Sequence, residues 1–132
     1  MTTELYWLTL TALLTGLFWV PYILNRFVEI GIITAMMNPE RDSRPTAQWA
    51  QRMMCAHTNA VENLVVFAVL ALAVHLSATG TEATALAAAI YFFSRLFHYI
   101  VYSLGIPGLR TVSFLVGFGC QMTLGLTALQ LL

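Results

Sequence analysis

The chain has 132 residues, of which 59% are hydrophobic and 9% are charged, and its formal net charge is zero. Soluble domains average roughly 45–50% apolar and about 25% charged residues, so this composition excludes an ordinary soluble protein and is typical of a membrane protein. The arginines form no basic cluster, which argues against nucleic acid as a partner. Cys55 and Cys120 each lie in an apolar helix pattern, so a disulfide framework is not expected.

Four apolar stretches are long enough to cross a bilayer, which takes about 20 residues in a helix. We expect one membrane domain over residues 1–132, with helices at about residues 4–36, 48–78, 83–105 and 109–131. Pro21 predicts a kink in the first helix. Asn38-Pro39 ends that helix before a charged surface loop at residues 40–45. The N-terminus is not expected to be a secretory signal, because it has Glu4 and no basic region.

Short connections make consecutive helices antiparallel neighbours, so the fold class is all-α, an up-down bundle of four transmembrane helices. The second connection holds no arginine, whereas the first holds four and the third holds Arg110: the four are Arg26, Arg41, Arg44 and Arg52. The positive-inside rule therefore predicts that the first and third connections are cytoplasmic and that both termini are non-cytoplasmic. In a bacterium this membrane would be the inner, plasma membrane.

Polar side chains inside membrane helices are costly and usually mark a functional site. At about 100° per residue, the polar residues of the last three helices each gather on one face of their helix. These faces are Arg52, Cys55, Asn59, Glu62 and Asn63; Tyr91, Arg95, His98, Tyr99 and Tyr102; and Arg110, Phe114, Gly117 and Gln121. Glu62 and Arg95 lie at similar depths, about 10 Å and about 14 Å from the cytoplasmic ends of their helices. We therefore expect one pocket that opens toward the cytoplasm.

Inside a membrane Glu62 needs a cation, and Arg95 or Arg52 is the expected partner. Such a pair could simply hold helices together, and the residues alone leave that alternative open. Three arginines, with Arg110 as the third, nevertheless face one carboxylate, and this surplus favours an anionic ligand held by bidentate hydrogen bonds. His57 points to the opposite side of its helix and is expected to be structural. No metal is expected, because no two His or Cys residues have a ligand spacing.

The segment Arg52 to Phe67, RMMCAHTNAVENLVVF, resembles the signature of the MAPEG family, the membrane-associated proteins in eicosanoid and glutathione metabolism. The second half of the chain is similar to the family as well. It has Arg95-x-x-His98-x-x-x-Tyr102, followed by Gly105-Ile106-Pro107-Gly108-Leu109-Arg110-Thr111. The resemblance covers essentially the whole chain, and we expect a bacterial-type member.

The resemblance implies a homotrimer in a lipid membrane that binds glutathione, as a co-substrate, between neighbouring subunits near the cytoplasmic face. A hydrophobic small molecule or lipid would be the second substrate. Arg110 would stabilise the glutathione thiolate, with the Thr111 hydroxyl beside it, by lowering the thiol pKa from about 8.5. The resemblance and the surplus of arginines together give the residues expected to hold glutathione: Arg52, Asn59, Glu62, Arg95, His98, Tyr102 and Phe114.

Several positions depart from the family pattern: Cys55 stands where many members have an arginine, Thr58 replaces another basic position, and Phe114 stands where a tyrosine can occur. The first helix also lacks an arginine that some members have. The first hypothesis is a glutathione-dependent transferase or peroxidase that acts on lipophilic electrophiles. The alternative is a non-catalytic lipid- or ligand-binding scaffold of the same fold. A small multidrug transporter, a third class with four short helices, needs an unpaired titratable carboxylate. Arginines accompany Glu62, which argues against that class.

Overall fold

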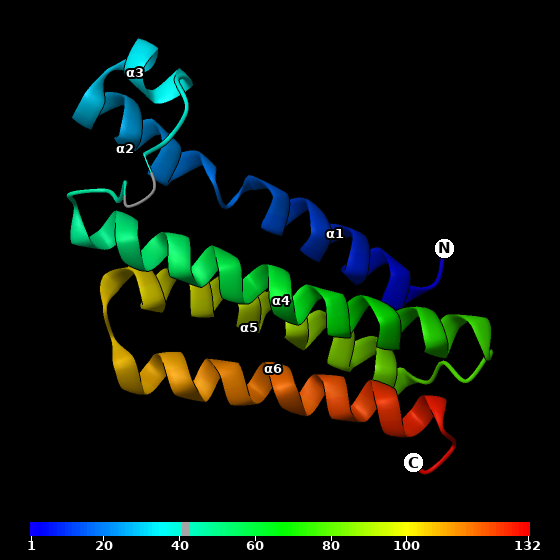
Figure 1. Cartoon of the computed structure of the whole chain (residues 1–132). Helices are drawn as coiled ribbons and strands as arrows, with labels where there is room; N and C mark the ends of the chain where they lie inside the picture. The colour runs from blue at the N-terminus through cyan, green and yellow to red at the C-terminus, as the bar shows by residue number, and fades with distance from the viewer. Residues whose placement is uncertain (41–42) are drawn as a thin grey trace.

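The computed structural model describes residues 1–40 and 43–132, and the chain forms a bundle of long helices (Figure 1). The helices are α1 (Thr3–Leu17), α2 (Val20–Ile30), α3 (Ile32–Met36), α4 (Gln48–Leu76), α5 (Glu82–Leu104) and α6 (Pro107–Ala128). Four spans are long and apolar enough to cross a membrane: α1 with α2, and then α4, α5 and α6. The prediction of an all-α four-helix membrane bundle is therefore confirmed.

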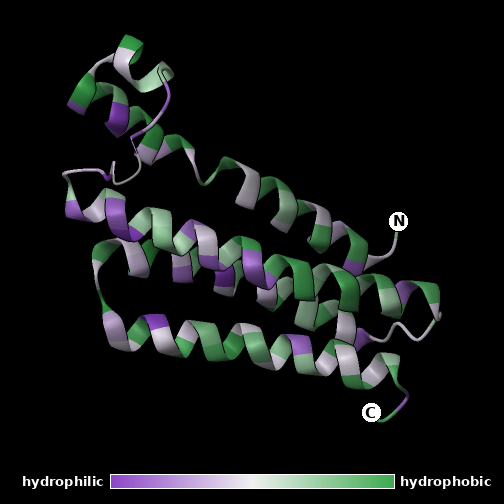
Figure 2. Cartoon of the chain, in the orientation of Figure 1, coloured by the Kyte–Doolittle hydropathy of each residue, from purple (hydrophilic) through white to green (hydrophobic). Residues whose placement is uncertain are grey.

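The α4–α5 pair forms the centre of the bundle, because α1 and α6 each pack against both of these helices. Figure 1 shows α1 and α6 on opposite sides of the pair, with α2 and α3 turned away from the bundle at one end. Hydrophobic residues make up most of the spans, with hydrophilic residues between them on α4, α5 and α6 (Figure 2), and the apolar majority suits contact with lipid. At the core, the Phe67 and Tyr91 rings stack with their centroids 3.8 Å apart.

The first membrane span is broken near Pro21, as the sequence predicted, and again at Gly31. Residues 4–36, expected as one helix, are thus divided into α1, α2 and α3. Pro21 has no N–H to donate to the preceding turn, and close to this break the Tyr99 hydroxyl donates to the carbonyl oxygen of Phe18 at 2.8 Å. Gly31 separates α2 from α3 with a φ of 80°, a conformation that favours glycine.

Glu29 of α2 binds the backbone immediately before α4, which begins at Gln48. Its carboxylate accepts hydrogen bonds from the backbone N–H groups of Thr46 and Ala47 at 3.0 and 2.9 Å. The Asn25 amide donates to the same carboxylate at 2.9 Å. Of the charged loop predicted at residues 40–45, residues 41 and 42 lie outside the described residues. The hydrogen bonds that Glu29 accepts hold the end of the α3–α4 connection against α2.

At the other end of the bundle, α5 begins with a capping box formed by Thr81 and Thr84. The Thr84 hydroxyl also donates to Oε1 of Glu4 at 2.6 Å, and Glu4 is only 5% exposed. A carboxylate that is buried to this extent needs such a hydrogen-bond donor. This hydrogen bond holds the start of α1 against the start of α5. It was not predicted from the sequence.

The α5–α6 contact depends on the absence of a side chain at Gly117. A Cβ at this position would lie 3.3 Å from Oγ of Ser94 and 3.6 Å from Cδ of Arg95. Gly119, on the same helix, has open space around the equivalent point. The two glycines therefore differ in what an added methyl group would meet.

We predict that Gly117→Ala lowers the melting temperature of the purified protein in detergent, because the methyl group forces α6 away from α5 at a cost of about 1–3 kcal/mol. Gly119→Ala is the matched control. It is expected to be neutral or to stabilise by about 0.5–1 kcal/mol, since alanine has the higher helix propensity. Equal melting temperatures for the two variants would contradict the close packing at Gly117.

Candidate functional site

A shallow groove of about 420 Å³ runs along the polar face of α4. Cys55, Thr58 and Glu62 on its wall are exposed, whereas Asn59 is half-buried at its floor. Spacings of three and four residues place these side chains on one face of the helix. The groove is completed by Tyr102 of α5 and by Met54. The polar arc expected on this helix therefore does line a concave surface.

Asn59 is held from behind by a buried arginine. Arg95 is 2% exposed, and its Nη2 donates to Oδ1 of Asn59 at 2.5 Å. A guanidinium can only donate, so the oxygen of the amide must face Arg95 and its nitrogen must face away. Nε of Arg95 has no hydrogen-bond partner among the described residues. The floor of the groove thus presents an N–H donor with a positive charge behind it.

The two arginines expected to pair with Glu62 have other partners in the structure. Besides the bond from Arg95 to Asn59, Nε of Arg52 donates to the Ser103 carbonyl at 2.9 Å. The guanidinium of Arg52 also packs on Gly105, where a Cβ would lie 3.2 Å from it. Arg52 therefore closes the α5–α6 turn, and the exposed carboxylate of Glu62 remains available to a ligand.

Arg110 contacts the groove through Tyr102. Its guanidinium carbon lies 4.7 Å from the centroid of the Tyr102 ring, a cation–π contact. The buried His98 ring packs against the same tyrosine at 5.6 Å and against Phe114 at 6.4 Å. Thr111 is exposed, and its hydroxyl donates to its own helix at the Pro107 carbonyl. Arg110 therefore contacts a residue that lines the groove, whereas the Thr111 hydroxyl bonds only to its own helix.

The predicted site residues divide into three groups. Asn59, Glu62 and Tyr102 line the groove. Arg95, Arg110 and His98 contact one of these lining residues, and Phe114 contacts His98. Arg52 and Thr111 bond instead to backbone carbonyls at or near the α5–α6 turn.

Other polar residues, both inside and outside the three stripes, serve the packing of the bundle. His57 bonds through Nδ1 to the Tyr22 hydroxyl at 2.8 Å, on the side of α4 that faces α2, as its position on the helix predicted. Gln121 donates to the Asn63 carbonyl at 3.2 Å. Tyr99, on the same stripe as Arg95, reaches α1 and not the groove. Several residues of the stripes are therefore used in contacts between helices, and the three stripes do not converge on a single pocket.

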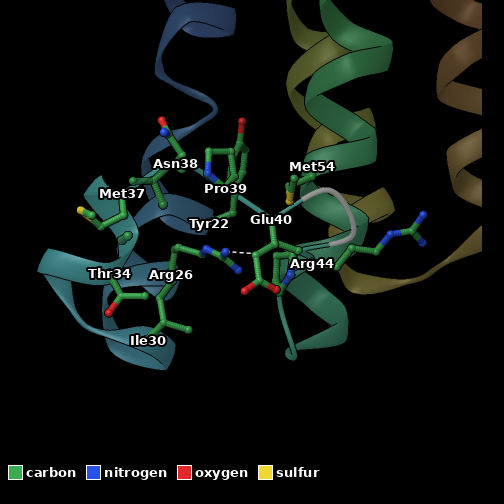
Figure 3. Close-up of a pocket in the computed structure, with 14 residues that line it drawn as sticks. Tyr22, Arg26, Ile30, Thr34, Met37, Asn38, Pro39, Glu40, Arg44 and Met54 are labelled. Carbon is green, nitrogen blue, oxygen red and sulfur yellow. Dashed lines mark hydrogen bonds between the residues drawn. The ribbon is translucent and has the colours of Figure 1, made fainter.

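A second cavity, of about 670 Å³, lies between α2, α3 and the connection to α4 (Figure 3). Arg26 reaches across it and donates to the Ser43 hydroxyl, whereas Arg44 extends away from Arg26. The sequence does not indicate this cavity, because it exists only where the connection folds back onto α2.

The fold and the groove together define an integral membrane protein with a polar site against one helix of a four-helix bundle. Residues 5–130 match the model of the MAPEG family, so the chain belongs to the MAPEG family. The family resemblance seen in the sequence is thereby confirmed. Neither the search of curated proteins nor that of solved structures gave a match.

We predict that Asn59→Leu destabilises the protein by about 1–3 kcal/mol or more, because it leaves the buried Arg95 cation without its acceptor. The double variant Asn59→Leu/Arg95→Met should recover most of that loss, since both polar partners are then removed together. Melting temperatures of the two variants in the same detergent test this coupling. If the double variant is less stable than the single one, Arg95 does not depend on Asn59.

Proposed function

We propose that this protein is a glutathione-dependent membrane transferase or peroxidase that conjugates or reduces lipophilic electrophiles. The observation that carries the proposal is the groove in which Asn59 offers a donor, Glu62 offers an acceptor and Tyr102 is backed by Arg110. Membership of a family concerned with eicosanoid and glutathione metabolism supports it.

The groove offers groups that match the ends of a small zwitterionic peptide. The Glu62 carboxylate can accept from an ammonium group, and the amide nitrogen of Asn59 can donate to a carboxylate or carbonyl oxygen. The Arg95 charge behind Asn59 favours an anionic group at that point. Arg110 would lie nearer the sulfur, where a guanidinium lowers the thiol pKa and raises the fraction of nucleophilic thiolate.

The second substrate would enter from the lipid. The exposed face of α4 that continues from the groove is apolar, with Val61 45% and Val65 62% exposed. A lipophilic electrophile dissolved in the bilayer could therefore approach the thiolate without crossing a polar surface.

We further propose that three copies assemble with their grooves at the subunit boundaries. The groove is shallow and Glu62 is exposed in the single chain, so a neighbouring subunit would supply the missing wall. The distribution of arginines favours an orientation with the groove toward the cytoplasm and both termini on the other side.

A second candidate is the non-catalytic binding scaffold, and the structure contains an observation in its favour. Of the charged residues expected to hold glutathione, only Glu62 lines the groove, because Arg52 and Arg95 bond within the protein. The Thr58 hydroxyl donates to its own helix at the Met54 carbonyl. A scaffold would bind lipid without turnover, so conjugation of glutathione by the purified protein distinguishes the two candidates.

We predict that the purified protein binds glutathione, measured by calorimetry, and that Glu62→Gln weakens this binding about tenfold, because a charged hydrogen bond is lost. Glu82→Gln is the matched control, since Glu82 is exposed in the first turn of α5 at the opposite end of the bundle. If the two variants bind glutathione with equal affinity, Glu62 is not part of the binding site.

The catalytic part of the proposal is tested with Arg110→Ala and with Arg44→Ala as its control. Arg110→Ala should raise the pKa of bound glutathione, read from the absorbance of the thiolate against pH. Once that pKa lies above the pH, each further unit lowers the thiolate fraction about tenfold. The rate of conjugation of chlorodinitrobenzene should fall as the thiolate fraction falls. Saturable binding with no conjugation by the wild-type protein would favour the scaffold.

A further inference from the structure

The second cavity lies at the end of the first membrane span and holds an arginine. Arg26 reaches across it, and among the described residues the Ser43 hydroxyl is the hydrogen-bond partner of its guanidinium (Figure 3). A guanidinium carries five N–H donors, so several of them remain available to a ligand. Arg44 and Glu40 also line the cavity, and the three charged side chains give its described lining a net positive charge. This cavity has no part in the function proposed above.

The length of the first span places the cavity at the level of the lipid headgroups. The span covers Thr3–Ile30, which is 28 residues, and at 1.5 Å per residue it is about 42 Å long. The hydrocarbon core of a bilayer is only about 30 Å thick, so about eight residues of the span lie beyond it. Because Glu4 holds the other end level with the start of α5, the residues beyond the core are those around Arg26.

Apolar residues beside the cavity are left exposed on α2 and α3. Val28 is 85%, Ile33 is 80% and Met36 is 77% exposed. Figure 1 shows that α2 and α3 turn away from the bundle, which leaves these side chains uncovered by the described parts of the chain. The apolar surface of the membrane span continues into them through the exposed Leu24. An apolar surface with a cation beside it is typical of a segment that lies in the membrane interface.

We propose that the second cavity binds the headgroup phosphate of an anionic phospholipid, with Arg26 as the main phosphate ligand. The acyl chains of the same lipid lie against the exposed apolar residues of α2 and α3. One molecule with an anionic head and apolar chains satisfies both features of this surface, the cation and the uncovered apolar face. The cavity volume of about 670 Å³ is within the range of small-molecule sites, about 300–1,000 Å³.

The apolar part of the lining suits the part of the lipid next to the phosphate. Ile23, Ile30 and Met37 line the cavity together with the charged residues, and they can contact the glycerol backbone and the first carbons of the chains. In the orientation proposed above, this end of the bundle faces the cytoplasmic leaflet, which carries a negative surface potential.

The experiment measures lipid binding to the full-length protein in detergent by native mass spectrometry. Phosphatidylglycerol and phosphatidylcholine with the same acyl chains are titrated separately. Phosphatidylglycerol should bind about tenfold more tightly, because choline neutralises the charge of the other headgroup and leaves less for the arginine to attract. Equal affinities for the two lipids would overturn the proposal.

Arg26→Gln should remove most of this preference by weakening the binding of phosphatidylglycerol about tenfold. Arg44→Gln is the matched control, because it removes the same charge from a side chain that lines the cavity but extends away from Arg26 (Figure 3). Its effect should be about twofold or less. Equal losses in the two variants would show that the lipid responds to the net charge of this end of the protein and not to the cavity, and the proposal would be wrong.

Glu40→Gln tests the cavity in the opposite direction. It removes a negative charge from the lining and should strengthen the binding of phosphatidylglycerol about twofold. A misfolded variant cannot produce such a gain in affinity. An unchanged or weaker affinity would contradict a phosphate bound in this cavity.

The apolar part of the site is tested with the double variant Val28→Ser/Ile33→Ser. Both side chains are exposed, so their replacement should leave the fold intact. The two lipids should bind more weakly to a similar degree, since they have the same acyl chains. If the double variant instead changes the oligomeric state and leaves lipid binding unchanged, a second copy of the chain covers this face and the proposal fails.

The last arm separates a lipid from a soluble compound with the same phosphate chemistry. Glycerophosphoglycerol, which is the deacylated headgroup, and inorganic phosphate are each added in about tenfold excess over phosphatidylglycerol. Neither should displace the lipid, because both lack the chains that contact α2 and α3. Displacement by either compound would identify a site for a soluble anion and overturn the proposal. These measurements need no glutathione, so the lipid site and the proposed function are tested independently of each other.

Discussion

The hydrogen bond from buried Arg95 to Asn59 is the interaction on which the groove depends. A guanidinium inside a membrane bundle must be solvated by the protein, because lipid offers it no hydrogen-bond acceptor. Asn59 provides an acceptor without neutralising the charge, and the amide is thereby fixed with its nitrogen turned away from Arg95. One packing requirement of the bundle thus orients the donor at the floor of the groove. Stability and recognition rest on the same pair of residues.

The helix that carries Arg95 connects the remaining parts of the structure. Successive polar residues of α5 reach different neighbours: Tyr99 holds the break in the first span, Arg95 holds α4, and the His98–Tyr102 pair lies toward Phe114 and Arg110 of α6. Gly117 allows α6 to approach this helix closely. Tyr102, which is half-buried, is contacted by both His98 and Arg110. The residues that line the groove belong to the helices α4 and α5 and not to loops, and helices hold side chains more precisely than loops do.

Much of the fold was predictable from the sequence, because the apolar stretches, Pro21 and the short connections each have a direct physical meaning in a membrane. The face of α4 that lines the groove was predictable from helical periodicity for the same reason. The partners of the arginines were not. Periodicity gives the direction of a side chain from its helix axis but not its reach, so Arg52 was placed beside Glu62 when it in fact bonds to the Ser103 carbonyl. Glu4 and the second cavity escaped prediction because their contacts join residues far apart in the chain.

Arg52 and Arg95 bond within the protein, and this changes which ligands the groove can bind. With these cations bonded inside the bundle, the groove wall carries one carboxylate, two small polar residues and a thiol. Anionic groups are then attracted by a charge behind the wall, and that attraction is weaker than direct bidentate contact. An arginine at position 55 would strengthen binding of a carboxylate, whereas the cysteine found there offers chemistry with sulfur. The departure from the family pattern at Cys55 therefore replaces a cation in the groove wall by a thiol.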